Sequence, residues 1–245
     1  VLCGRNFEYF SEDPLLAGAQ VAEEIQGAQA KGVYAFIKHF ALNDQETNRT
    51  HMLATWTNEQ ALREVYLRPF EIGVKQGGAH AVMSAFNYIG TTYAGAHPEL
   101  LNTVLRQEWG FQGMVLTDYF AGYGYQNADQ IVRNGGDFML ATLDIDIAKV
   151  NTQSDAGLAQ MRRASHNILY TVANSWMYEN GQPEVERNTW EYITWVVAGA
   201  LILALVGLEV VAFRRYRARA AAGAESAPPT RDTGEGDGTR GGGAE

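Results

Sequence analysis

Cysteine and positive charge are both scarce in this sequence of 245 residues. Cys3 is the single cysteine, which excludes an intramolecular disulfide and any metal site built from several cysteines. Lysine and arginine together number 19 against 28 aspartates and glutamates, which gives a net charge of −9. Because nucleic acids are bound by lysine and arginine clustered on one face, no nucleic-acid partner is expected.

A starting methionine and a secretory signal are also missing. The chain opens with Val1-Leu2-Cys3, without the basic segment and following apolar segment that define a signal peptide. We therefore expect the natural N-terminus to lie upstream of Val1.

Composition divides the chain into three parts. Residues 1–182 have the mixed composition of a globular domain, and residues 190–213 form the most apolar stretch. Residues 214–245 are rich in alanine, glycine, proline and charge and have no periodic apolar face. This last part is therefore predicted to be a disordered tail.

The apolar stretch predicts one transmembrane helix. About 20 apolar residues are enough to cross a bilayer, and aromatic side chains (Trp190, Tyr192, Trp195) stand at its start, as at a membrane interface. Four arginines follow its end: Arg214, Arg215, Arg217 and Arg219. Because positive charge stays cytoplasmic, we expect a single-pass protein of the cell membrane, with the globular part extracellular, the C-terminus cytoplasmic and membrane lipid as a partner. The alternative is a buried helix of a soluble core.

Strands and helices are expected to alternate in the globular part. Short apolar runs at residues 33–37, 80–86, 113–117 and 137–140 predict strands. Helical patterns cover residues 14–30, 58–75, 98–109, 127–133 and 157–176. This alternation predicts an α/β fold with a parallel sheet or barrel. Four strands are half of a (β/α)8 TIM-type barrel, so the predicted fold is a partial barrel of that type, followed by the transmembrane helix and the tail.

Polar residues come at the ends of two of these strands. Asp118 follows the run 113–117, and Lys38-His39 ends the run 33–37. In a parallel barrel the carboxyl ends of the strands form the catalytic face, so these side chains are candidates for ligand contact. From the residues alone, the structural alternatives are favoured: Asp118 as a turn or helix-capping aspartate, and Lys38 and His39 as a salt bridge and a satisfied core histidine.

Four segments in a fixed order carry a resemblance to a known family. They are residues 4–14 (GRNFEYFSEDP), 38–49 (KHFALNDQETNR), 82–87 (VMSAFN) and 109–119 (WGFQGMVLTDY). Together they resemble the family 3 glycoside hydrolases, chiefly the β-glucosidase branch. The resemblance covers residues 1–141 and extends more weakly to residue 176.

The resemblance implies a role for each matched residue. Asp118 matches the nucleophile of a retaining glycosidase, which would form a covalent glycosyl-enzyme without a metal or cofactor. Residues that match those holding the sugar in the first subsite are Arg5, Lys38, His39 and Arg49, with Met83 and Phe86 lining it and Tyr119 beside the nucleophile. The family often has tyrosine at Phe86, tryptophan at Tyr119 and Met-Pro-Gly at Met139-Leu140-Ala141. Phe86 would lose the hydrogen bond that a tyrosine hydroxyl makes.

The acid/base partner is the missing part of this hypothesis. In the family it usually comes from an α/β sandwich domain after the barrel, whereas here a predicted membrane helix follows. We expect this domain to precede the barrel in a permuted order, and the 245-residue chain alone to be nearly inactive. The implied substrate is a glycoside or oligosaccharide with terminal β-linked glucose or xylose. The alternative is an inactive carbohydrate-binding barrel anchored at the membrane.

Overall fold

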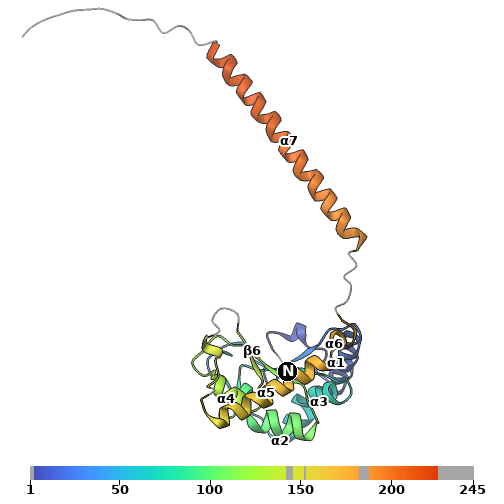
Figure 1. The fold of residues 1–245 in the computed structure, drawn as a ribbon, viewed down its shortest axis with the longest axis vertical. Helices are drawn as coiled ribbons and strands as arrows, with labels where there is room; N and C mark the ends of the chain where they lie inside the picture. Colours follow the sequence, from blue (N-terminus) through green and yellow to red (C-terminus); the bar gives the residue numbers. More distant parts are fainter. Residues whose placement is uncertain (1–2, 142–145, 152, 182–187, 226–245) are drawn as a thin grey trace, which may run out of the picture. The chain divides into compact units, whose positions relative to one another are not determined.

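The computed structural model describes residues 3–141, 146–151, 153–181 and 188–225. The chain forms two compact units, Val1–Pro183 and Glu184–Glu245. The first is an α/β unit and the second contains the long helix α7 (Figure 1).

A four-stranded parallel sheet with the order β1-β3-β6-β7 forms the centre of the first unit. Its strands are β1 (Phe36–Phe40), β3 (Ala81–Ser84), β6 (Met114–Tyr119) and β7 (Phe138–Leu140). Helical elements before, between and after these strands are α1 (Pro14–Gln29), α3 (Arg68–Lys75), η4 (Glu99–Glu108), α4 (Ala128–Arg133) and α5 (Asp155–Ala173), gathered around the sheet in Figure 1. The predicted α/β fold with a parallel sheet is confirmed.

Shorter elements fill the connections. These are η1 (Asn6–Glu8), α2 (Glu59–Ala61), η2 (Leu62–Tyr66), η3 (Ala94–Ala96), η5 (Asp146–Ala148) and α6 (Trp176–Asn180). A second sheet, in the order β2-β4-β5, consists of β2 (Ala54–Thr55), β4 (Tyr88–Ile89) and β5 (Thr92–Tyr93). This small sheet was not predicted, because strands of two residues have no readable alternation.

Several predicted elements differ from the structure. β6 ends at Tyr119 and so contains Asp118, which was expected to follow the strand, and the helix expected at residues 157–176 ends at Ala173. β1 begins at Phe36 and includes Lys38 and His39, so these residues lie within the strand rather than after it. The helix expected at residues 58–75 is divided into α2, the π-helical η2 and α3. The break comes just before Pro69, which has no amide hydrogen to continue the regular helical bonding.

The core lies between the sheet and its helices. Phe40, Leu101, Leu105 and Val115 are almost completely buried, and Phe40 packs edge-on against Trp109. Burial of such side chains contributes about 1.5–3 kcal/mol each. The helices α1 and α3 approach closely because Gly18 has no side chain; a Cβ there would lie 2.5 Å from Ile72 Cδ1.

A buried polar network ties the amino end of the sheet together. Asp137, just before β7, has a side chain that is 0% exposed. Its Oδ2 accepts hydrogen bonds from Arg106 Nη2 at 2.8 Å and the Val115 backbone N–H at 2.7 Å, and its Oδ1 accepts one from Asn167 Nδ2 at 2.8 Å. Burial raises the pKa of Asp137 and the Arg106 charge opposes this rise. The carboxylate thus joins η4, β6, β7 and α5.

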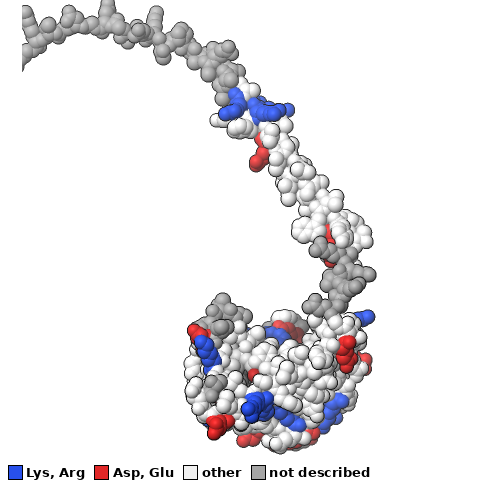
Figure 2. All heavy atoms as spheres, in the orientation of Figure 1, with Lys and Arg blue, Asp and Glu red and all other residues white. Residues whose placement is uncertain are grey.

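The second unit contains α7 (Thr189–Glu225). Its stretch Thr189–Arg219 is long and apolar enough to cross a membrane by length and composition. Side chains such as Trp195 and Leu203 are exposed. Arg217 stacks on Phe213 at 5.2 Å, in the basic group that Figure 2 shows on this helix.

The tail prediction is wrong for residues 214–225, which continue α7 as helix. Arginine and alanine dominate this part of the sequence, and both are strong helix formers. The rest of the predicted tail, residues 226–245, lies outside the described residues.

Candidate functional site

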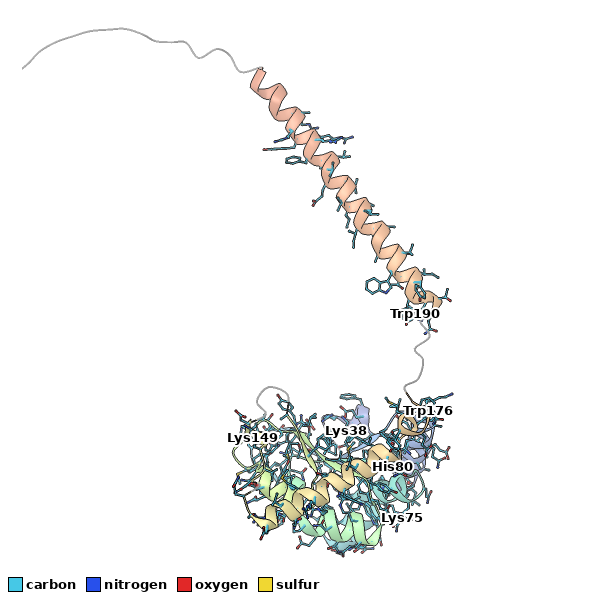
Figure 3. The ribbon with its side chains drawn as sticks, viewed as in Figure 1. Lys38, Lys75, His80, Lys149, Trp176 and Trp190 are labelled. Atoms are coloured by element: carbon cyan, nitrogen blue, oxygen red, sulfur yellow. The ribbon has the colours of Figure 1, made fainter. Side chains whose placement is uncertain are left out.

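The candidate site lies at the carboxyl end of the parallel sheet. Lys38 and His39 come from β1, Met83 from β3 and Asp118 from β6. Lys38 is labelled near the upper rim of the globular unit in Figure 3. The side chain of Asn87 bonds the Ala41 carbonyl and Thr55 Oγ1, each at 3.1 Å, which docks the small sheet beside this end.

Asp118 is the most deeply placed carboxylate of the site. Its side chain is 12% exposed. Oδ1 accepts a hydrogen bond from the Tyr119 backbone N–H at 2.7 Å, while Oδ2 lies 3.3 Å from His39 Nε2 and 3.9 Å from Arg49 Nη1. Burial raises the pKa of Asp118, and the Tyr119 amide and the charges of Arg49, Arg5 and Lys38 oppose the rise. The cations therefore favour the ionised form, as expected, but burial has the larger effect.

His39 stands between Asp118 and Arg5. Its Nε2 lies 3.5 Å from Arg5 Nη1. Burial lowers the pKa of His39 to about 3, and the positive charges of Arg5, Lys38 and Arg49 add to this effect. A neutral imidazole offers one donor and one acceptor, which suits contact with a hydroxyl group.

We predict that His39 stays neutral across the physiological pH range. Its ring nitrogens should show no titration by NMR between about pH 5 and pH 8, because adding a proton would place a second cation next to Arg5 in a buried site. A titration midpoint near the ordinary value of 6.5 would contradict this electrostatic description.

Arg49 also approaches the Asp118 carboxylate. Its Nε pairs with Glu46 Oε2 at 3.1 Å, and its guanidinium lies over the Phe86 ring, 4.8 Å from the centroid. Phe86 is only 2% exposed. Phe86 therefore packs against the Arg49 guanidinium, a contact that the sequence did not indicate.

Arg5 and Lys38 share a carboxylate that the sequence reading left without a role. Glu8 accepts from Arg5 Nε at 2.8 Å and from Arg5 Nη2 at 2.7 Å, and its Oε2 pairs with Lys38 Nζ at 3.1 Å. The hydrogen bonds from Arg5, ahead of those from Lys38, lower the pKa of Glu8 to about 2. The Arg-x-x-Glu spacing within residues 4–14 was the available signal, because residues three apart can pair in a helical turn.

Two buried atoms at the centre of the site have no hydrogen-bond partner among the described residues. They are Asp118 Oδ2 and Arg49 Nη1. Buried polar atoms are nearly always paired in folded proteins, so such atoms indicate a place for a polar ligand. Within the part of the chain that the structure describes, no cluster of histidine, cysteine and acidic residues could hold a metal ion.

The structure thus brings most of the predicted site residues together. Arg5, Lys38, His39, Arg49 and Asp118 form one continuous network of contacts. Two others flank it: Met83, half-buried, pairs with Leu116 of β6, and Tyr119 directly follows Asp118.

Gln126 was not predicted from the sequence. Its side chain accepts from the Ala121 amide at 3.1 Å and donates to the Tyr119 carbonyl at 3.2 Å, which holds the turn after β6.

Comparisons with known proteins point to one family. The sequence model described as the glycosyl hydrolase family 3 N terminal domain matches residues 3–165. A β-glucosidase of Rhizobium radiobacter is 48% identical over 122 residues, which is 50% of this chain and 15% of the relative. A β-glucosidase of Ruminococcus albus is 37% identical over 180 residues, 69% of this chain and 19% of the relative.

A solved structure agrees with these sequence relatives. β-Glucosidase 3B from Thermotoga neapolitana in complex with α-D-glucose superimposes with a TM-score of 0.66 at 35% identity, over 79% of this chain and 28% of that chain. The chain therefore spans a minor part of the length of the relatives that it matches.

Proposed function

The chain belongs to glycosyl hydrolase family 3, and from this we propose that it is the nucleophile-bearing part of a retaining β-glucosidase. The observation that carries the proposal is the buried Asp118 carboxylate at a strand end, within reach of Arg49 and next to neutral His39. Asp118 Oδ2 makes no hydrogen bond to the described residues, which leaves this oxygen for a ligand, and a carboxylate can act as a nucleophile toward a sugar carbon.

The chemistry begins with attack of Asp118 Oδ2 on the anomeric carbon. The glycosidic bond breaks, the leaving oxygen takes a proton from an acid, and a covalent glycosyl-enzyme forms. Water then attacks the same carbon, its proton passes to the conjugate base of that acid, and Asp118 is released. Oδ1 stays bonded to the Tyr119 amide, which fixes the direction of Oδ2.

The remaining side chains would bind the sugar. Arg5, Lys38 and Arg49 supply N–H donors for hydroxyl oxygens, and neutral His39 supplies one donor and one acceptor. Met83 and Phe86 would line the first subsite, with Phe86 acting through Arg49, and Tyr119 would border it. Terminal β-linked glucose is the proposed sugar, because the related structure from Thermotoga neapolitana holds glucose. Xylose, which lacks the hydroxymethyl group, is the second candidate.

The acid/base is proposed to come from another part of the full-length protein. Two carboxylates of the described residues are linked to the site, and each is paired with an arginine. Glu8, with a pKa lowered to about 2, is ionised at neutral pH and cannot donate a proton. Glu46 Oε2 forms an ion pair with Arg49 Nε at 3.1 Å. A permuted α/β sandwich domain would supply the missing group.

The test is hydrolysis by the full-length protein. We expect release of nitrophenol from an aryl β-glucoside, with the first-formed glucose in the β-configuration by NMR. Formation of α-glucose would contradict the retaining mechanism. Glucose binding without any turnover would instead favour the alternative function, an inactive carbohydrate-binding barrel.

We also propose that α7 anchors the protein in the cell membrane, with the catalytic part outside. Deleting residues 189–225 from the full-length protein should move it from the membrane fraction to the soluble fraction, because the segment that spans the hydrocarbon is lost. The matched control is deletion of residues 226–245, which should leave the protein in the membrane. Recovery of the α7 deletion in the membrane would contradict the anchor. Hydrolysis of a membrane-impermeant glucoside by intact cells tests the orientation.

A further inference from the structure

We propose that Glu8 is a positioning residue of the first sugar subsite, holding Arg5 and Lys38 in place and balancing their charge beside Asp118. The inference rests on the proposed function and assigns a role to a side chain that would not touch the reacting atoms. Its geometric basis is a row of contacts that runs from Lys38 through Glu8, Arg5 and His39 to Asp118.

The first argument is the orientation of the Arg5 guanidinium. Nε and Nη2 both bond the Glu8 carboxylate, at 2.8 and 2.7 Å, so one edge of the planar group is fixed. The remaining nitrogen, Nη1, then lies 3.5 Å from His39 Nε2, on the side of the proposed sugar. A bidentate arginine–carboxylate pair is geometrically specific, so Glu8 determines which nitrogen faces the site.

The second argument is the sharing of one carboxylate by two cations. Lys38 Nζ lies 3.1 Å from Glu8 Oε2, the same oxygen that accepts from Arg5 Nη2. An ammonium has three N–H donors, so this contact still leaves donors for a ligand. Without the negative charge, Arg5 and Lys38 would repel each other and sample other rotamers.

The third argument is charge balance around Asp118. Charged and titratable groups lie around it on η1 and the residue before it (Glu8, Arg5), on β1 (Lys38, His39), on the loop after β1 (Glu46, Arg49) and on the phenols Tyr93 and Tyr125. Glu8 offsets part of the positive charge in this set. Neutralising Glu8 would leave Asp118 in a more positive surrounding and lower its pKa.

The experiment compares Glu8→Gln and Glu8→Asp in the full-length protein. Gln keeps the shape but removes the charge, whereas Asp keeps the charge and shortens the reach. For Glu8→Gln we expect kcat/KM for an aryl β-glucoside to fall about tenfold or more, mainly through KM, because charge-assisted hydrogen bonds are weakened. The acid limb of the pH profile of kcat/KM reports the ionisation of Asp118 in the free enzyme. For Glu8→Gln this limb should move to lower pH. Glu8→Asp should raise KM and leave the acid limb at the wild-type position.

Glu108→Gln is the matched control. Glu108 receives an equivalent bidentate contact from Arg63, at 2.6 and 3.1 Å, but on the helices η4 and η2 away from Asp118. KM and the pH profile of this variant should equal those of wild type. Thermal denaturation of every variant separates loss of folding from loss of binding.

Each outcome supports the inference or overturns it. Wild-type KM and a wild-type acid limb in Glu8→Gln would overturn it while the proposed function stands. A lower melting temperature of Glu8→Gln without movement of the acid limb would also overturn it, because a purely structural role predicts that result. A full-length wild-type protein that hydrolyses no β-glycoside would overturn the proposed function and this inference with it.

Discussion

Asp118→Asn is expected to reduce hydrolysis of a β-glucoside by the full-length protein by about 10⁴-fold or more. The amide has nearly the shape of the carboxylate, but its oxygen carries no negative charge and cannot form the ester with the sugar. Because Arg5, Lys38, His39 and Arg49 remain, glucose should still bind with an affinity close to that of wild type. Steady-state kinetics and isothermal calorimetry measure the two effects separately.

The control is Asp129→Asn. Asp129 lies in the first turn of α4 and accepts a hydrogen bond from the Asn151 amide at 2.6 Å, a contact that an asparagine oxygen can still make. The same chemical change outside the site should leave kcat and KM unaltered. Near-normal turnover in Asp118→Asn would remove Asp118 from the role of nucleophile.

The second large effect is on stability. Asp137→Ala should lower the free energy of unfolding by about 3–5 kcal/mol, because it leaves the Arg106 guanidinium buried without its partner. The Arg106 side chain is 14% exposed, and the Val115 amide and Asn167 would also lose an acceptor. Urea denaturation of the full-length protein, followed by the fluorescence of the buried Trp109, measures the change.

Two comparisons isolate the cause of this loss. Glu108→Ala removes one of the two carboxylate partners of Arg63 on the surface, where Glu59 remains, and such exposed pairs contribute at most about 1 kcal/mol. The double variant Arg106→Met with Asp137→Leu should be more stable than Asp137→Ala, because no unpaired charge stays buried. An Asp137→Ala variant as stable as Glu108→Ala would show that the network does not hold the amino end of the sheet.

The sequence predicted the part of the site that depends on sheet topology. Parallel strands bring their carboxyl ends to one edge, so Lys38, His39 and Asp118 could be expected together once β1 and β6 were recognised. The four segments in their fixed order carried the resemblance to the family, and this resemblance added Arg5 and Arg49 to the predicted site. These predictions needed only the strand pattern and the resemblance to a family.

Other features depend on side-chain contacts that no local pattern reports. The packing of Phe86, which is 2% exposed, against the Arg49 guanidinium is one such contact. Glu8 was left without a role, and Gln126 was not singled out, because their partners are fixed only in the folded chain. The helix at residues 214–225 was missed because composition indicated disorder, while alanine and arginine favour helix locally.

The central claim is a covalent bond between Asp118 and the sugar. The test is to incubate the full-length protein with a 2-deoxy-2-fluoro-β-glucoside that has a good leaving group. The fluorine should slow hydrolysis of the covalent intermediate more than its formation, which the good leaving group assists, so the intermediate should accumulate. Mass spectrometry of the digested protein should then find one fluoroglucosyl group, on the peptide that contains Asp118. Labelling of a different carboxylate, or turnover without any labelled peptide, would contradict the account.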